Sequence, residues 1–416
     1  MDKETMFEYI QRLKLAVITL FKWLFCSVVC GCFIGSVGAV FHLMLGYVGS
    51  LRVEYPFLLF GLPVAGIIIV FMYNIVHEAG NRGTNLVITA IQSNDEVPGR
   101  VAPLIIVSTL LTHLCGGSAG REGAALQVGG ALGNTFAKLF KFDEKDTRIM
   151  IMCGMSACFS ALFGTPIFSM EVISVGVMYY AALVPCVLAA FIAQGIASAL
   201  GLESTHFVVD EITSFSFING SKFIIMSVLF ALVSILLCVV LHGTSKLYTD
   251  YINNPYIRII IAGALVIAMR YIFGTTDYLG AGSDIIARSF VTSCAWYVFL
   301  LKMLFTAVTL GGGFKGGEIV PTLFVGATLG SFLAPTLGLP VGLCAACGMV
   351  SVFCGVTNCP LTSFILSIEM FGASTMKFTI LCIALSYLLS GYYSLYNSQK
   401  IVYSKYKTEY INRRSH

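Results

Sequence analysis

Charged side chains are scarce in this sequence. Asp, Glu, Lys and Arg make up 11% of the 416 residues, whereas hydrophobic residues make up 57% and the mean hydropathy is +0.87. This composition excludes a chain of two or three soluble domains. The net charge of +4 is too small to indicate a nucleic-acid partner. The composition is typical of a polytopic membrane protein, with the lipid bilayer as its solvent.

The sequence also lacks the residue clusters that bind metals or form disulfide frameworks. Its six histidines are scattered and form no HExxH-type pattern. Nearly all of its fourteen cysteines lie in apolar runs, where cysteine packs as a small hydrophobe. Cys344 and Cys347 have CxxC spacing, but the segment GLCAACGMV reads as an apolar helix without a second pair or a histidine. We therefore expect no metal site and no cofactor.

Although the mean hydropathy is high, several apolar stretches are short or interrupted. A transmembrane helix needs about 20 apolar residues, and segments such as 103–115 and 341–356 are shorter or interrupted by glycine. Irregular backbone survives at membrane depth when it is buried in protein or lines a cavity. We expect an all-α polytopic membrane protein with many tilted and broken helices. The longer apolar runs are 15–48, 55–76, 223–242, 293–309 and 375–397.

Basic residues flank the apolar part of the chain at both ends. Lys3, Arg12 and Lys14 precede the first apolar run, and Lys400 and Arg414 follow the last. By the positive-inside rule, both termini are expected in the cytoplasm, with an even number of full crossings. We expect a multi-pass protein of the plasma (inner) membrane.

An internal repeat divides the chain. LQVGGALG (126–133) matches LFVGATLG (323–330), an offset of 323 − 126 = 197 positions. Just upstream, GGSAGREG (116–123) parallels GGGFKGGE (311–318). Repeated halves with broken helices at matching positions are typical of transporters, whose site lies between the repeats.

We therefore expect one membrane domain, residues 1–416, built from two related halves. The first half covers about 15–200 and the second about 220–397. Residues 1–14 read as a short amphipathic helix on the cytoplasmic surface, and 398–416 as a short tail.

Glu122 is the most informative charged residue. GREG leads into the apolar run AALQVGGALG, which places Glu122 at the start of a helix. Helix N-termini attract anions, so a carboxylate there can occupy an anion site, leave it when protonated, and return. The alternative is a carboxylate that merely caps the helix, with Arg121 as its partner. Because a charge inside a membrane costs about 2.5–3.5 kcal/mol or more, we favour the functional interpretation.

Three other polar positions are candidates. Glu318 lies at the equivalent break in the second half and reads as a second pathway carboxylate or as a cap near Lys315. Asn85 and the backbone N–H groups of Leu86 and Val87 could donate to an anion, or Asn85 could serve as an ordinary N-cap. Among the tyrosines near the C-terminus, Tyr396 could face the pathway or lie in the interfacial aromatic belt.

Two further features favour a structural role over a functional one. Glu171 and Glu369 follow prolines within helices, which favours structural hydrogen bonds. Ser118 lies in a G-x-S-x-G pattern with His113 nearby, as in a serine hydrolase. A nucleophile elbow needs a strand–turn–helix context, and this motif leads into GREG instead. A serine hydrolase is therefore the least favoured alternative, and we expect a protein that is not an enzyme.

GGSAGREGAALQVGGALG, together with the repeat, closely resembles the CLC family of anion channels and transporters over nearly the whole chain. The resemblance implies a homodimer with one anion pathway per subunit, built from inverted repeats. It also implies that Glu122 gates the pathway and couples protons, and that Gly120, Arg121 and Gly123 beside it contribute to the anion-binding site. A tyrosine of the last membrane helix would line the pathway, and SLYNS selects Tyr396.

Two blocks narrow the branch. GTNLV (83–87) and GGEIVP (316–321) stand where chloride-type members carry GSGIP and GxFxP. Both resemble the bacterial fluoride-exporting branch, in which Asn85 would replace a serine. The second motif would then comprise Gly317, Glu318, Ile319 and Val320. The implied function is a fluoride/proton antiporter. A chloride/proton exchanger or a passive anion channel of the same family is the alternative.

Three departures from the family pattern bear on this assignment. Val320 stands where the branch often has a threonine. The inner glutamate of many chloride/proton exchangers has no clear counterpart. Pro166 and Glu171 are five positions apart, whereas Pro360 and Glu369 are nine apart. The first half thus lacks four residues, about one helical turn or 6 Å, in a segment that corresponds to part of the family's dimer interface.

Overall fold

The computed structural model describes residues 3–78, 80, 83–93, 97–166 and 180–415. Most of the shortened segment between Pro166 and Glu171, including Glu171 itself, lies outside these residues. The first half forms α1 (Lys3–Val29), a π-helical turn η1 (Cys30–Ile34), α2 (Gly35–Glu54), η2 (Pro56–Gly61), α3 (Leu62–Ile75), α4 (Thr84–Gln92), α5 (Val101–Leu114), α6 (Glu122–Leu139), α7 (Glu144–Phe163), η4 (Tyr180–Ala182) and α9 (Leu183–Ala199).

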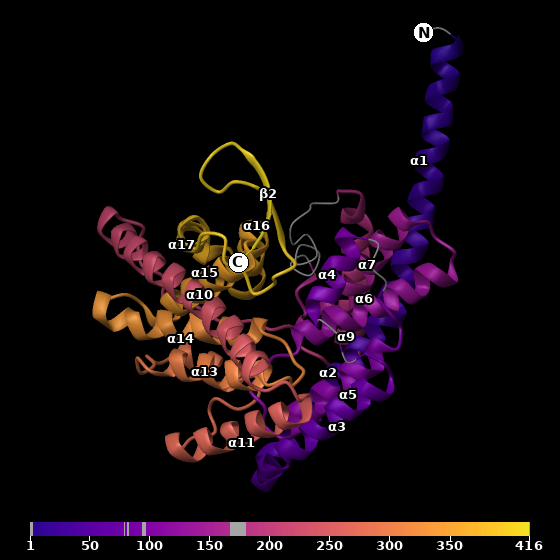
Figure 1. Cartoon of the computed structure of the whole chain (residues 1–416). Coiled ribbons are helices and arrows are strands. Elements are labelled where there is room, and N and C mark those ends of the chain that lie inside the picture. The colour runs from indigo at the N-terminus through magenta and orange to yellow at the C-terminus, as the bar shows by residue number, and fades with distance from the viewer. Residues whose placement is uncertain (1–2, 79, 81–82, 94–96, 167–179, 416) are drawn as a thin grey trace.

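The second half repeats this order of long and short helices. It forms α10 (Phe217–Tyr251), α11 (Pro255–Phe273), α12 (Ser283–Ser289), α13 (Val298–Gly311), α14 (Ile319–Leu337), α15 (Val341–Thr357), α16 (Pro360–Phe371), η5 (Ala373–Thr375) and α17 (Met376–Leu389). Helices α5 and α13 begin 298 − 101 = 197 positions apart, and α6 and α14 begin 319 − 122 = 197 positions apart. The offset found in the sequence is therefore the structural offset. The two halves form the two sides of the molecule in Figure 1.

Local signals explain where several helices begin and end. Asp143 caps α7 by accepting from the N–H of Asp146 at 2.8 Å, and Ser216 caps α10 by accepting from the N–H of Asn219 at 3.2 Å. Helix α7 ends at Gly164, which has φ 69°. Glycine adopts this left-handed conformation without steric strain, so the helix stops there.

Small residues let the central helices of each half approach closely. A Cβ on Gly129 of α6 would clash with the carbonyl group of Gly154 of α7. In the second half, Gly326 of α14 meets Gly348 of α15 in the same way. Close backbone contact between small residues is a common way to associate helices in a membrane. The repeat therefore extends to how the helices pack.

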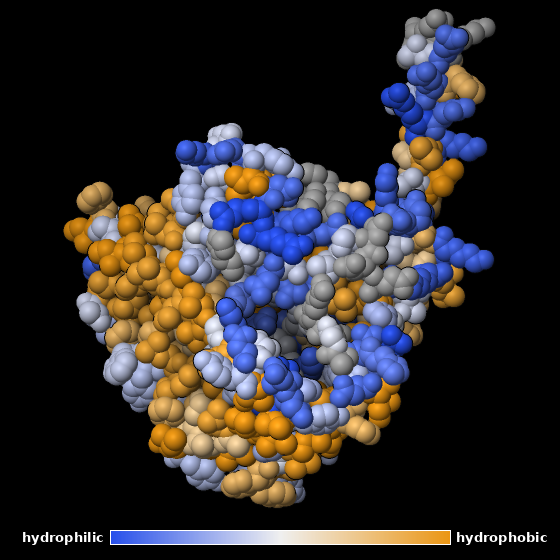
Figure 2. Space-filling model, in the orientation of Figure 1, coloured by the Kyte–Doolittle hydropathy of each residue, from blue (hydrophilic) through white to orange (hydrophobic). Residues whose placement is uncertain are grey.

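The outer surface is largely apolar. Among the described residues, six helical segments are long and apolar enough to cross a membrane, and exposed hydrophobic side chains such as Ile272 and Leu232 cover them. Figure 2 shows these orange side chains over much of the visible flank, whereas hydrophilic side chains gather near the centre and top. The segments are Glu4–Glu54, Pro56–Ile75, Glu144–Phe163, Phe217–Tyr251, Pro255–Phe273 and Ile319–Leu337. The protein is an all-helical integral membrane protein in its main body, as predicted.

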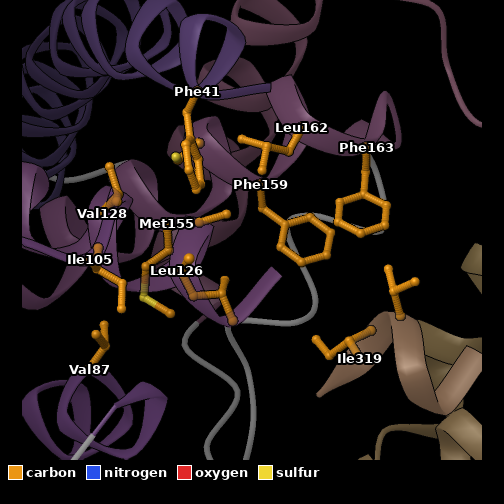
Figure 3. Packing of buried hydrophobic residues seen from close by; sticks show 14 of the residues in the cluster. Phe41, Val87, Ile105, Leu126, Val128, Met155, Phe159, Leu162, Phe163 and Ile319 are labelled. Atoms are coloured by element: carbon orange, nitrogen blue, oxygen red, sulfur yellow. The ribbon is translucent and has the colours of Figure 1, made fainter. Parts of the chain in front are cut away.

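The hydrophobic core joins the two halves. Phe41, Phe159 and Met155 are buried together in the first half, and Ile319, at the start of α14, belongs to the same cluster. Figure 3 shows Ile319 on the ribbon that faces the first-half side chains. The beginning of α14 is therefore built into the boundary between the repeats.

The two ends of the chain differ from expectation. The helix expected over residues 1–14 is not separate in its described part, 3–14, because α1 runs without a break from Lys3 to Val29 and projects from the body (Figure 1). The tail contains two strands that were not predicted, β1 (Lys400–Tyr403) and β2 (Tyr410–Arg414), in an otherwise helical fold. These strands pair antiparallel as a hairpin.

Candidate functional site

The two glycine-rich breaks pair with each other. The N–H of Gly120 donates to the carbonyl of Gly317, and the N–H of Gly317 donates to that of Gly120, both at 2.7 Å. Helix α6 begins two residues after Gly120, at Glu122, and α14 begins two residues after Gly317, at Ile319. This reciprocal bridge between equivalent residues brings the N-termini of two equivalent helices together.

Glu122 lies at this meeting point. It is fully buried, and its Oε2 accepts a hydrogen bond from the N–H of Val320 at 3.2 Å. Its Oε1 has no partner among the described residues. A side chain on Gly120 or Gly317 would collide with Oε2, so both glycines make room for the carboxylate. Glu122 therefore starts α6 and reaches across to the first turn of α14.

A third helix N-terminus joins the other two. A Cβ on Gly123 would lie 2.8 Å from Thr84 Oγ1, at the start of α4, and 3.3 Å from the Cα of Gly317. The N-termini of α4, α6 and α14 thus converge around residues 122–123. Each presents free N–H groups and a partial positive charge, which together favour an anion.

Asn85 and Leu86 lie in the first turn of α4. The Asn85 side chain is half-buried, and its Oδ1 accepts from the N–H of Ser398 at 3.1 Å. Its amide nitrogen has no hydrogen-bond partner in the described part of the chain and could donate to an anion. The N–H of Leu86 donates to the carbonyl of Gly83 at 3.1 Å. In this structure the Leu86 N–H is therefore used by the turn that starts α4, and its role as an anion donor stays a prediction.

Tyr396 is buried, 2% exposed, but it does not belong to the last membrane helix. Helix α17 ends at Leu389, and Tyr396 lies in the loop that precedes β1. It packs in one cluster with Ile88 of α4, and its phenol is close enough to interact electrostatically with Glu122 and Glu318. The loop therefore brings Tyr396 to the same region as α4 and the two carboxylates.

Glu318 is the N-cap residue of α14. By the offset of 318 − 121 = 197 it corresponds to Arg121, and Ile319 corresponds to Glu122. Its carboxylate has no hydrogen bond or ion pair within the described residues, yet it interacts electrostatically with Glu122. Lys315, considered above as its partner, instead lies 4.6 Å from the centre of the Tyr73 ring. Glu318 is thus a second carboxylate near Glu122.

Arg121 attracts Glu122 electrostatically but forms no ion pair or hydrogen bond with it. Its guanidinium donates to the carbonyl of Leu162 at 3.3 Å and lies 5.8 Å from the centre of the Phe163 ring. It also lines a cavity of about 810 Å³, whose wall includes Val320 of the first turn of α14. Arg121 therefore faces this cavity rather than the carboxylate beside it in sequence.

The cavity is rich in cationic side chains, which sequence reasoning did not find. Its wall contains two aspartates, Asp277 and Asp284, and the cationic or titratable residues Arg52, His113, Arg121, Arg270 and Arg288. These positions are far apart in the chain, so no local pattern reveals them. The cavity lies beside the break that carries the buried carboxylate, because Arg121 and Val320 belong to its wall.

Lys302 is a second feature near Glu122 that the sequence analysis did not predict. It is a lone lysine in the apolar run 293–309, and a charge in such a run indicates a functional or paired residue. The side chain is fully buried, and its Nζ donates to the carbonyls of Tyr278 at 3.2 Å and Gly280 at 2.6 Å. It interacts electrostatically with Glu122. Lys302 thus places a buried amino group within electrostatic reach of Glu122.

Ser118 is not a nucleophile. It is fully buried, with its Oγ 3.0 Å from Thr306 Oγ1, and its N–H donates to Thr309 Oγ1 at 3.1 Å. His113 Nε2 instead lies 3.2 Å from the Gly120 carbonyl oxygen. The hydrolase alternative is wrong, because the histidine is engaged with the backbone of the helix break.

These features define a class of protein: a membrane transport protein with a buried carboxylate among converging helix N-termini. The model for the voltage gated chloride channel family matches residues 64–391. The chain belongs to this family, which is the CLC family, and it is a transport protein rather than an enzyme.

Individual relatives agree with this membership. A chloride/fluoride channel protein of Pseudomonas syringae pv. tomato is 35% identical over 396 residues, covering 92% of this chain and 88% of the relative. An H(+)/Cl(-) exchange transporter ClcA of Vibrio parahaemolyticus is 23% identical over 388 residues, covering 85% and 82%. The crystal structure of a CLC-type fluoride/proton antiporter has a TM-score of 0.87 at 31% identity and covers 91% of this chain and 98% of that one.

Proposed function

We propose that this protein exports fluoride in exchange for protons. The observation that carries the proposal is the position of Glu122, a buried carboxylate with one oxygen on the Val320 N–H and the other without a described partner. As a carboxylate it can occupy the anion position formed by the helix N-termini. When protonated it loses its attraction for those N–H groups, and an anion can take its place.

This exchange couples the two ions. Because Glu122 must accept a proton to leave and release it to return, each cycle moves protons and anions across the same site. An inward proton gradient then drives the anion out of the cell. Glu318, close enough to interact with Glu122, is a second carboxylate that can hold a proton on this path.

The preference for fluoride rests on hydrogen-bond donors. Fluoride is small, strongly hydrated and a strong acceptor, so it needs directed donors to replace water. The amide nitrogen of Asn85 and the hydroxyl of Tyr396 are the candidate donors. The names of two similar proteins, a chloride/fluoride channel protein and a fluoride/proton antiporter, support the same choice.

We also propose a homodimer in the plasma membrane with both termini in the cytoplasm. The resemblance to CLC proteins supports the homodimer, and the basic residues at both ends support the orientation. Consistent with this orientation, the N-terminal end of α1 and the C-terminal hairpin extend toward the same side of the molecule in Figure 1.

A liposome assay tests the function. Purified protein is reconstituted, vesicles are loaded with fluoride or chloride, and anion efflux is recorded together with internal pH. We expect fluoride efflux to exceed chloride efflux and to draw protons inward. Equal fluxes of the two anions would identify a less selective transporter. Fluoride efflux without proton movement would identify a passive channel, which the printed name of the Pseudomonas relative keeps as the second candidate.

A further inference from the structure

The loop that carries Tyr396 is anchored by one buried glutamine. Gln399 is 2% exposed, and its Nε2 donates to the carbonyl of Thr357, the last residue of α15, at 2.7 Å. Its Oε1 accepts from Ser394 Oγ at 2.6 Å and from Asn358 Nδ2 at 3.4 Å. Both ends of the amide are therefore used, and residues 394–399 are fixed against the end of α15.

The C-terminal hairpin holds the same loop from its other side. Ser415, which follows β2, donates its N–H to the Gln399 carbonyl at 3.0 Å and its Oγ to the Tyr396 carbonyl at 2.8 Å. The N–H of Gln399 also donates to the Tyr396 carbonyl at 2.9 Å, which closes a turn over Asn397 and Ser398. The loop is thus held between α15 and the hairpin.

This turn presents the Ser398 N–H to Asn85, 313 positions away in the chain. A backbone N–H can donate but not accept, so the Asn85 atom that faces it must be the carbonyl oxygen. The NH₂ group of Asn85 then points to the opposite side, where no described residue takes it. The loop thereby decides which end of the Asn85 amide is free for an anion.

We propose that Gln399 is a positioning residue for anion selection. It holds Ser398 so that the Asn85 amide presents its NH₂ group, rather than its oxygen, to fluoride, and it holds Tyr396 through the same turn. If the loop loosens, the amide can rotate by half a turn and place an acceptor against the anion. This inference rests on the proposed function, because it assumes that Asn85 is a fluoride donor.

The test compares anion fluxes of full-length variants in liposomes. Gln399→Leu keeps the side-chain size and removes its three side-chain hydrogen bonds, with Thr357, Ser394 and Asn358. We expect its ratio of fluoride to chloride flux to fall about tenfold, the scale of losing one hydrogen bond to a charged group. Ser398→Ala keeps the backbone N–H and should retain the ratio. Gln194→Leu removes another partly buried glutamine, which donates to the Gly164 carbonyl at 3.2 Å, and should also retain it.

A purely structural role predicts a different result. It would lower both fluxes of Gln399→Leu in parallel and leave the ratio unchanged, which would overturn the proposal. If Gln399→Leu does not fold, the smaller change Ser394→Ala loosens the same loop, because Ser394 Oγ donates to Gln399 Oε1 and accepts from the Tyr396 N–H. An unchanged ratio there would also overturn it. If the unmodified protein transports chloride as fast as fluoride, the proposed function is rejected, and this inference is rejected with it.

Discussion

The carboxylate of Glu122 has features that a simple helix cap does not need. It is fully buried, it reaches the N–H of Val320 on the other half of the protein, and two glycines leave space around it. Burying a carboxylate without a matching cation is costly. Arg121, the adjacent cation, instead contacts Leu162 and Phe163. This cost is understandable if the carboxylate has to change its protonation state and leave its place.

We predict that Glu122→Gln abolishes proton coupling. Glutamine is close in size to the protonated side chain but cannot take up or release a proton. A fluoride gradient should then move no protons beyond the background of empty vesicles, as recorded by a pH dye inside them. Glu211→Gln, at an exposed position, should behave like the unmodified protein. Continued proton pumping by Glu122→Gln would show that another group carries the proton.

A second prediction concerns Lys302, whose Nζ satisfies the carbonyls of Tyr278 and Gly280. Lys302→Met leaves both carbonyls without this donor. An unsatisfied buried group costs about 1–3 kcal/mol, so the free energy of unfolding should fall by about that amount. Denaturation of the purified protein in detergent measures it. Lys246→Met, on an exposed part of α10, is the matched control and should change little.

At the scale of helices, the close pairs α6–α7 and α14–α15 depend on glycine. A Cβ at Gly129 would overlap the carbonyl of Gly154, so Gly129→Ala must push the helices apart. We expect a loss of about 1–3 kcal/mol in unfolding free energy, seen as a lower midpoint in thermal denaturation. Gly326→Ala should have a similar effect, because it meets Gly348 in the same way. Gly243→Ala, with open space around it, should be neutral or slightly stabilising.

The same helices show what the sequence could and could not predict. The repeat, the glycine breaks and the positions of Glu122 and Asn85 follow from local patterns, because helix starts have local signals. The bridge between Gly120 and Gly317 and the bond between Ser398 and Asn85 join residues far apart in the chain, and neither was predicted. The position of Tyr396 outside the last helix was not predicted either, because an apolar run does not specify where its helix ends.

For the molecule as a whole, arginines of both halves line one cavity, and neither half supplies its positive charge alone. Arg52 and Arg121 come from the first half, and Arg270 and Arg288 come from the second. Asp277 lies 3.7 Å from Arg288 and offsets part of this charge. A cavity lined mainly by one sign of charge raises the local concentration of the opposite ion and speeds its arrival.

Arg270→Gln tests this field. It removes one positive charge from the cavity wall without touching the buried carboxylate. Salt screens over about 30 Å at 0.01 M but about 8 Å at 0.15 M. Anion flux through the variant should therefore fall about two- to threefold at low ionic strength and approach that of the unmodified protein at high ionic strength. Lys377→Gln makes the same change in net charge on α17, away from the cavity wall, and should leave flux unchanged at both salt concentrations. Equal loss of flux by Arg270→Gln at both concentrations would point to a structural role for the arginine, since a steering charge must act through a field that salt can screen.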